Sequence, residues 1–283
     1  MKPTLVVATL VAAGGVALLA GSAVAQQQSK AQQLCINKMN KDGVVYASKQ
    51  GKEQVQCLKD AATQSLGMMT GEACLTADRK GRVAKRATKT TDDETSFCGQ
   101  APNFAYTSAA NVNTVAQQQE VNLVHDVFGS PLDPNVKLCD PNKPECLCQF
   151  KVYSKIEKLA FTLGRDFVKC KKDQLAALVT SSSAIEDCLT NAALVGSVAN
   201  DPKGKITDRV ANLQTTITLQ CDNPGVTLGS FPGRCNGLTE SGLGNCLYAR
   251  VKCRMCLMYN AMDGLSVDCD AFDDDDTSNA SCP

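Results

Sequence analysis

Apolar side chains recur every three or four positions in the stretch that begins at Cys148. This spacing places them on one stripe of an α-helix, and the residues are Val152, Ile156, Leu159, Leu163, Phe167 and Cys170. A weaker stripe, at Met39, Tyr46 and Val55, follows Cys35. The pattern therefore predicts a mainly α-helical protein with two long helices.

Both stretches belong to an internal repeat. The segment from Cys35 to Asp60 aligns without gaps on the segment from Cys148 to Asp173. The matched positions include Cys35 with Cys148, Ala47 with Ala160, Gly51 with Gly164 and Cys57 with Cys170, and further on Cys74 with Cys188 and Cys98 with Cys221. We therefore expect helical hairpins, held by disulfides and arranged in tandem repeat.

Further helices are predicted from start signals and periodicity. Ser183 to Glu186 has the form of a capping box, which predicts a helix through about Val198. Asp201 and Pro202 predict the start of a third helix that ends near Cys221. Two more helices are expected over residues 115–128 and 247–258.

Helix geometry restricts how the cysteines pair. Cys35 and Cys57 would lie about 33 Å apart along one helix, far beyond the reach of a disulfide. An antiparallel partner running from Cys74 to Cys98 would present two cysteines at matching heights. We therefore predict the pairs Cys57 with Cys74, Cys35 with Cys98, Cys170 with Cys188, and Cys148 with Cys221. Pairing of Cys139, Cys146, Cys235, Cys246, Cys253, Cys256, Cys269 and Cys282 stays open.

The N-terminal residues have the pattern of a secretory signal peptide. Lys2 precedes an apolar run from Leu5 to Ala20, and the small residues Ala23 to Ala25 form a cleavage site. Ser22 stands where a lipoprotein would need its acylated cysteine, so no lipid anchor is expected. We expect a secreted or periplasmic protein organised as residues 1–25 signal peptide, 26–98 first repeat, 99–147 connector, 148–221 second repeat, and 222–283 a loop-rich cysteine block with an acidic tail.

Composition supports an oxidised, exported protein. The sequence has 16 cysteines, an even number, which favours up to eight disulfides in an oxidising compartment. Acidic and basic side chains balance at 29 each, so no overall charge attracts nucleic acid or an anionic membrane. No segment after the signal is apolar enough to span a bilayer. We expect an unknown extracytoplasmic protein or polymer as partner.

Two features bear on catalysis. Cys253 and Cys256 have the C-x-x-C spacing of thiol–disulfide exchange enzymes, which keeps an oxidoreductase open as an alternative. The single histidine, His125, lies beside Asp126, which points elsewhere on a helix, and no hydrolase or phosphate-binding motif is present. We therefore expect no catalytic residue and no enzyme.

The C-terminal segment is strongly acidic. Residues 263–283 contain seven aspartates and neither Lys nor Arg. Asp268, Asp270, Asp273 and Asp275 are candidate Ca²⁺ ligands, with Cys269 and Cys282 closing the loop that holds them. A Ca²⁺-dependent surface or adhesion component is therefore a second alternative, and a solvated acidic tail without a cofactor is the simpler interpretation.

A basic cluster lies in the first repeat. Six bases follow one another closely, at Arg79, Lys80, Arg82, Lys85, Arg86 and Lys89, and the last four share one helical face. Such a face is typical of solvated helices, but it also suits an anionic polymer or the acidic tail of a neighbouring molecule.

The C-terminal block from Cys246 resembles the endings of uncharacterised secreted cysteine-rich repeat proteins of Gram-negative environmental bacteria. The resemblance rests on the C-x-x-C, N-x-x-D-G-L and D-C-D-x-F-D-D elements, and it covers the chain from Cys246 to its C-terminus and, more loosely, the cysteine repeat. It implies no activity and no site residues. The sequence as a whole therefore predicts an exported, disulfide-rich structural or binding module.

Overall fold

The computed structural model describes residues 27–191, 203–222 and 229–269, together with residues 201, 226 and 272. Residues 1–25, the expected signal peptide, lie outside this set. In the described ranges the chain is helical and has no strand, which confirms the mainly α-helical prediction. The helices are α1 (Lys30–Ala62), α2 (Gly71–Cys74), α3 (Arg82–Phe97), α4 (Ala109–Phe128), η1 (Asp133–Asn135), α5 (Cys139–Ala176), α6 (Ser183–Thr190), α7 (Lys205–Cys221) and α9 (Glu240–Asp263).

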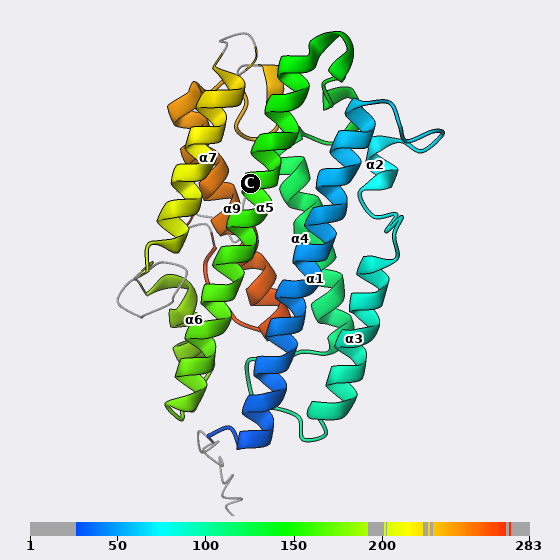
Figure 1. Cartoon of the computed structure of the whole chain (residues 1–283). Helices are drawn as coiled ribbons and strands as arrows, with labels where there is room; N and C mark the ends of the chain where they lie inside the picture. Colours follow the sequence, from blue (N-terminus) through cyan, green and yellow to red (C-terminus); the bar gives the residue numbers. More distant parts are fainter. Residues whose placement is uncertain are drawn as a thin grey trace, which may run out of the picture.

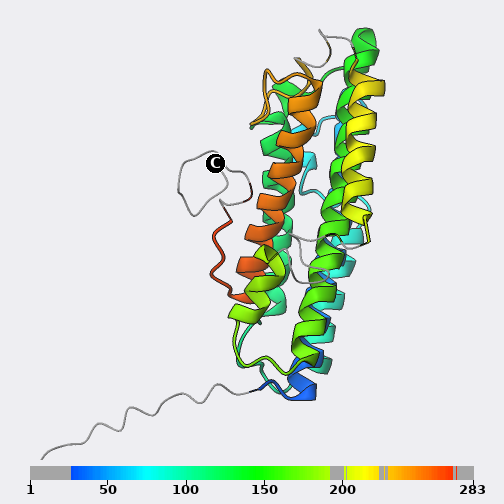
Figure 2. The same cartoon turned by 90° about the vertical axis from the view of Figure 1, so that its left-hand side faces the viewer.

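The long helices form two layers. In one layer α3, α1, α5 and α7 lie side by side in that order (Figure 1). In the other, α4 and α9 pack on each other, α4 against α1 and α9 against α5 (Figure 2). The predicted α5 stripe faces this interior, and every residue from Val152 to Cys170 on that stripe is buried. Burial of these apolar side chains between the layers is the main force that holds the helices together.

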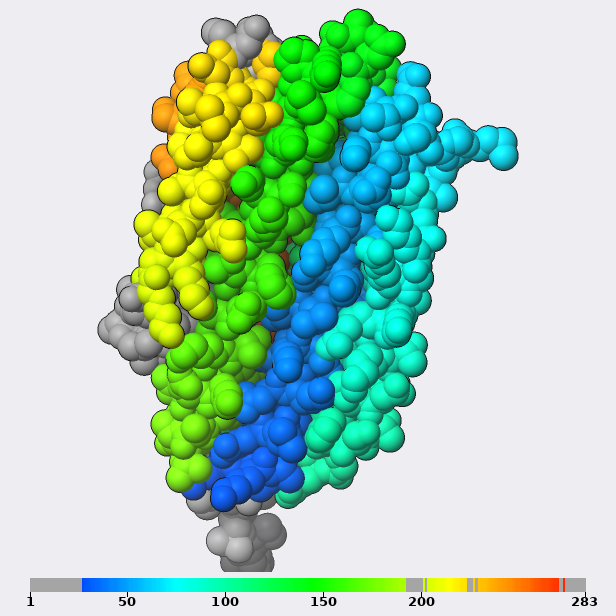
Figure 3. Space-filling model, viewed as in Figure 1, coloured from blue at the N-terminus to red at the C-terminus, as the bar shows by residue number. Residues whose placement is uncertain are grey.

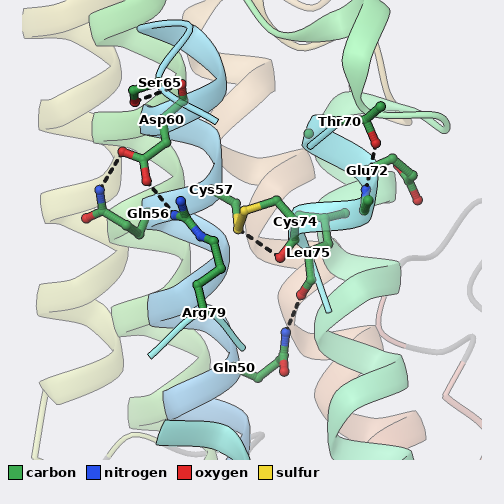
Figure 4. Close-up of a disulfide and its surroundings, with 12 residues drawn as sticks. Gln50, Gln56, Cys57, Asp60, Ser65, Thr70, Glu72, Cys74, Leu75 and Arg79 are labelled. Atoms are coloured by element: carbon green, nitrogen blue, oxygen red, sulfur yellow. Dashed lines mark hydrogen bonds and ion pairs between the residues drawn. A yellow bond between two sulfur atoms is a disulfide. The ribbon is translucent and has the colours of Figure 1, made fainter. Parts of the chain in front are cut away.

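Disulfides join the ends of neighbouring helices. Cys35–Cys98 connects α1 to the end of α3, and Cys148–Cys221 connects α5 to the end of α7. Cys57–Cys74 attaches the short helix α2 to α1 (Figure 4). Cys170–Cys188 attaches the short helix α6 to α5. These are the four pairs predicted from helix geometry. Cys139–Cys146, Cys235–Cys246 and Cys256–Cys269 are the other pairs whose two partners are both described.

The two long helices approach each other closely at small residues. A Cβ atom on Gly51 of α1 would lie 1.5 Å from Oε2 of Glu157 on α5. A Cβ atom on Gly164 of α5 would lie 3.2 Å from the side chain of Val44 on α1, and 2.5 Å from the Tyr259 hydroxyl. Both positions therefore require glycine unless the facing side chains move.

The two long helices, α1 and α5, begin earlier than predicted. The start of α1 is fixed by a capping box. The Ser29 hydroxyl accepts a hydrogen bond from the backbone N–H of Gln32, and the side-chain oxygen of Gln32 accepts one from the backbone N–H of Ser29. α5 begins at Cys139, well before Cys148, and its first turn contains non-helical backbone at Asp140 and Asn142. The Cys139–Cys146 disulfide holds this irregular turn to the helix.

One continuous helix from Cys74 to Cys98 was expected, and this is wrong. The chain forms the short α2, then turns through Gly81 at a φ of +62° before α3 begins. Glycine adopts this left-handed backbone without the steric cost of a Cβ atom. Asp78, which precedes the N-cap residue Gly81, caps α3. Its carboxylate accepts hydrogen bonds from the backbone N–H groups of Val83 and Ala84.

The expected caps in the second repeat are also corrected. The N-cap of α6 is Ser182 and makes no side-chain cap bond, while Glu186 accepts instead from the Ser266 amide at 3.0 Å. α6 ends at Thr190, and residues 192–200 of its expected continuation lie outside the described residues. α7 starts after Gly204, at a φ of +65°, and Asp201 caps it by accepting from the Thr207 amide.

α4 and α9 are longer than their patterns predicted. α4 starts at Ala109 instead of residue 115, because the Ser108 hydroxyl accepts from the Asn111 amide and caps an earlier turn. α9 runs from Glu240 to Asp263 instead of 247–258. Its added turns bury Leu243 at one end and Met262 at the other, which stabilises the longer helix. None of the described helices is long and apolar enough to cross a membrane.

Candidate functional site

The basic face of α3 lines a groove beside α1. The two helices lie next to each other on the surface of the molecule (Figure 3). The groove has a volume of about 710 Å³ and is lined by Val45, Lys49, Arg82, Lys85, Arg86, Thr88, Lys89 and Asp92. Five of these residues are cationic and one is anionic. The predicted basic face is thus part of a concave, positively charged surface.

Buried acids between the two helices hold part of this cationic surface in place. The Arg86 guanidinium donates to Asp42 of α1, whose side chain is 1% exposed. Lys89 of α3 pairs with Asp93, and Lys38 of α1 approaches the same carboxylate at 3.0 Å. These contacts order the wall of the groove and reduce the entropy that Arg86 and Lys89 would lose on binding a ligand.

Asp42 and Asp93 have pKa values that are shifted in opposite directions. Burial raises the pKa of Asp42 to about 6, although the Arg86 charge opposes this. Burial also acts on Asp93, but hydrogen bonds from Lys89 and Lys38 outweigh it and lower the pKa of Asp93 to about 2. Asp93 therefore stays ionised at neutral pH, and Asp42 gains a proton as the pH falls below about 6.

Three cations of the groove have no anionic partner among the described residues. Arg82, Lys85 and Lys49 make no ion pair there, and Arg82 and Lys85 are exposed. A ligand that carries several negative charges along one direction would neutralise them together. The groove is therefore suited to an extended polyanion.

The other two bases of the predicted cluster lie outside the groove. Arg79 and Lys80 belong to the loop before α3, and the Arg79 guanidinium donates to Asp60 of α1 (Figure 4). Asp60 also accepts from the Gln56 amide at 2.7 Å, so this contact joins the loop to the end of α1. Arg79 has a structural role close to the Cys57–Cys74 disulfide.

His125 makes a structural contact. Its Nε2 lies 2.9 Å from Oε1 of Glu72, and Oε2 of Glu72 accepts from the backbone amide of Leu132. The neighbouring Asp126 instead accepts two hydrogen bonds from Arg254, at 2.6 and 2.7 Å. The histidine and the aspartate thus face different partners, as expected for adjacent positions on a helix.

The C-x-x-C cysteines are not bonded to each other. Cys256 pairs with Cys269, and Cys253 is engaged in a separate disulfide. Both residues are fully buried. The expected loop closure by Cys269 and Cys282 is wrong, because Cys269 is already bonded to Cys256. An exchange reaction needs an accessible pair that alternates between dithiol and disulfide, and this arrangement does not supply one.

Most of the acidic segment lies outside the described residues. Of the four candidate Ca²⁺ ligands only Asp268 is described, and Asp270, Asp273 and Asp275 are not. In the part of the chain that is described, no three His, Cys, Asp or Glu side chains gather in a way that would hold a metal ion. Calcium binding by the tail therefore stays a prediction.

Sequence patterns did not reveal a pair of carboxylates inside the bundle. Glu120 of α4 is 2% exposed, and its side chain lines the same small internal cavity as that of Glu157 on α5. Burial raises the pKa of Glu157 to about 7, and burial together with the Glu157 charge raises the pKa of Glu120. The pair therefore holds at least one proton at neutral pH, and Glu157 loses its proton as the pH rises through about 7. The signal in the sequence was Gly51, which makes room for the Glu157 carboxylate.

The raised pKa of Glu157 makes the stability of the protein depend on pH. Because the pKa of Glu157 rises from 4.5 to about 7 on folding, the folded state binds the extra proton. The stabilisation of the folded state by this proton is complete below pH 4.5 and is lost as the pH rises through about 7. Glu157→Gln should therefore raise the free energy of unfolding at pH 8.5 by about 1–3 kcal/mol and flatten the profile between pH 5 and 8, as measured by urea denaturation. The exposed Asp187→Asn is the control, and equal profiles for the wild type and Glu157→Gln would contradict the raised pKa of Glu157.

Comparison of the chain with protein-family models, curated proteins and solved structures yields no match.

Proposed function

We propose that this chain is an extracytoplasmic, disulfide-stapled binding module, and not an enzyme, whose α1–α3 groove takes an anionic polymer. The described cysteines are all oxidised, which supports an oxidising compartment. The contacts of His125 with Glu72 and of Cys256 with Cys269 use the residues that a hydrolase or an oxidoreductase would need. A rigid scaffold with a charged groove is a common form of a binding protein.

We further propose that the scaffold arose from two copies of one three-helix unit. The supporting observation is that matched residues occupy matched places, since Gly51 faces Glu157 of α5 and Gly164 faces Val44 of α1. Val44 and Glu157 are themselves equivalent in the gap-free alignment of the repeat. The first unit would comprise α1, α3 and α4, and the second α5, α7 and α9, related by a pseudo-twofold axis between α1 and α5.

The assignment of α4 and α9 as equivalent third helices goes beyond the cysteine repeat. Aligned on their N-caps, Ser108 and Thr239, the two helices share buried positions. Val112, Ala116, Val127 and Phe128 then correspond to Leu243, Leu247, Met258 and Tyr259, and all eight are buried. The segment expected to be a connector would in this view complete the first unit.

The observation that carries the binding proposal is the combination of paired and unpaired cations in one groove. Arg86 and Lys89 are held by Asp42 and Asp93, whereas Arg82 and Lys85 project from the same wall without an ion pair in the described structure. A face that served only solubility would not need the buried acids between α1 and α3. The net charge of the chain is zero, so the attraction is local.

Binding of dextran sulfate, with neutral dextran as the matched uncharged polymer, tests this proposal. We expect the oxidised full-length mature chain to bind only the sulfated polymer, with an affinity that decreases with salt. Arg82→Ala/Lys85→Ala should weaken binding by about tenfold or more, since each charge contact contributes on the order of 1 kcal/mol. Lys30→Ala/Lys172→Ala removes the same charge elsewhere and should bind like the wild type. Equal loss in both double variants would overturn the groove as the site.

A further inference from the structure

A second groove lies between α5 and α7. It has a volume of about 450 Å³ and is lined by Lys158, Phe161, Thr162, Arg165, Asp166, Lys205, Asp208, Arg209 and Asn212. Four of these side chains are cationic and two are anionic. None of the sequence patterns pointed to this surface, because its bases come from two helices that are separated in the chain by α6.

The second groove occupies the same place in its unit as the first. On the long helices, in the gap-free alignment of the repeat, Val45 and Lys49 correspond to Lys158 and Thr162. The shorter helices align on the glycines that precede them, Gly81 and Gly204, so that Arg82, Lys85, Arg86 and Lys89 correspond to Lys205, Asp208, Arg209 and Asn212. All of these helical residues line their grooves. The two concave surfaces are therefore equivalent positions of the repeat.

Both grooves open on one face of the molecule. α4 and α9 cover one side of the layer formed by α3, α1, α5 and α7, and Arg82 and Lys205, which line the two grooves, are exposed. Figure 3 shows these four helices together on a single face. An extended ligand bound along α1 and α3 can continue across the same face to α5 and α7.

We propose that the α5–α7 groove is a second ligand site, and that the ligand of both grooves is an acidic polysaccharide; this rests on the proposed function. The retained cations Lys205 and Arg209 stand at the positions of Arg82 and Arg86. Two further cations, Lys158 and Arg165, lie on the opposite wall. The second groove therefore keeps a positive balance although Lys85 and Lys89 are replaced in it by Asp208 and Asn212.

The polar groups of this groove select the class of polymer. The carboxylates of Asp166 and Asp208 repel anions but accept hydrogen bonds from hydroxyl groups, and the Asn212 amide offers both a donor and an acceptor. The Phe161 ring is partly exposed and lies 5.8 Å from the Arg165 guanidinium, which leaves an apolar edge beside a cation. A sugar chain offers carboxylates to the cations and several hydroxyls per residue to Asp166, Asp208 and Asn212, and it matches this mixed lining better than a nucleic acid, whose backbone presents phosphates with few or no hydroxyls.

Calorimetric titration with a short oligogalacturonate, too short to span both grooves, tests this inference. We expect two molecules bound per wild-type chain and one molecule per chain for Lys205→Ala/Arg209→Ala. The variant Arg82→Ala/Lys85→Ala should also bind one, and the combined variant none. Because all four side chains are exposed, circular dichroism and thermal unfolding should stay unchanged in each variant.

The outcomes separate this inference from the proposed function. If the wild type binds one molecule, and only Arg82→Ala/Lys85→Ala removes it, the second site is overturned while the first groove stands. If Arg82→Ala/Lys85→Ala binds dextran sulfate as the wild type does, the proposed function itself fails. Equal or tighter binding of single-stranded DNA with the same number of charges, lost in Lys205→Ala/Arg209→Ala, would overturn the polysaccharide as the ligand.

Discussion

Lys171→Met is expected to lower the free energy of unfolding by about 3–5 kcal/mol, because it removes one partner of a fully buried ion pair. Lys171 Nζ lies 2.5 Å from Oδ2 of Asp263, and both side chains are 1% exposed. The ammonium also donates to the Ala105 carbonyl, and Asp263 accepts from the Asn40 amide at 2.6 Å. The pair joins α1, α5 and α9, so its loss affects both layers.

The matched control removes both charges. Lys171→Met/Asp263→Asn leaves no uncompensated charge and keeps an acceptor for Asn40, so most of the lost stability should return. Urea denaturation of the oxidised protein at pH 7 measures all variants, and Lys172→Met at the exposed neighbouring position controls for the substitution itself. A cost below about 1 kcal/mol for Lys171→Met would mean that Asp263 finds water or another partner, contrary to its burial.

Removal of the Cys35–Cys98 disulfide is expected to cost about 4 kcal/mol. This bridge closes a loop with a sequence separation of 63, whereas Cys57–Cys74 closes one of 17. If disulfides act mainly by restricting the unfolded chain, the longer loop contributes more, and loss of the shorter one should cost about 3 kcal/mol. The bridge Cys148–Cys221, with a sequence separation of 73, should behave like Cys35–Cys98.

Paired Cys→Ala variants measured by denaturation under non-reducing conditions give these differences. Each variant removes both cysteines of one bridge, so no new thiol remains to exchange with the others. The order of the losses in stability decides the question: removal of Cys35–Cys98 or Cys148–Cys221 should cost more than removal of Cys57–Cys74 or Cys170–Cys188. A larger loss for Cys57→Ala/Cys74→Ala than for Cys35→Ala/Cys98→Ala would show that local packing, and not loop closure, dominates.

Features that depend on neighbouring residues could be predicted from the sequence. The stripe from Val152 to Cys170 defines a helix because residues three and four apart share a face. The fixed rise per residue of an α-helix excluded a Cys35–Cys57 bridge within α1 and led to the four pairs that the structure contains. Helix ends were predicted less accurately. Asp201 was expected to be the N-cap residue of α7, but the N-cap is Gly204, and the Asp201 carboxylate reaches past it to accept a hydrogen bond from the Thr207 backbone amide.

The tertiary structure alone decided which distant residues meet. Lys171 and Asp263 become partners only because α5 packs against α9. Glu120 and Glu157 meet only because the two layers bring α4 and α5 to one small cavity, and no periodic pattern within one helix predicts this. Cys256 pairs with Cys269 and not within its C-x-x-C motif because the chain turns back after α9. The basic face of α3 was visible in the sequence, since it lies on one helix. Its groove was not, because the opposite wall comes from α1, and adjacency between helices is set by the packing of the whole bundle.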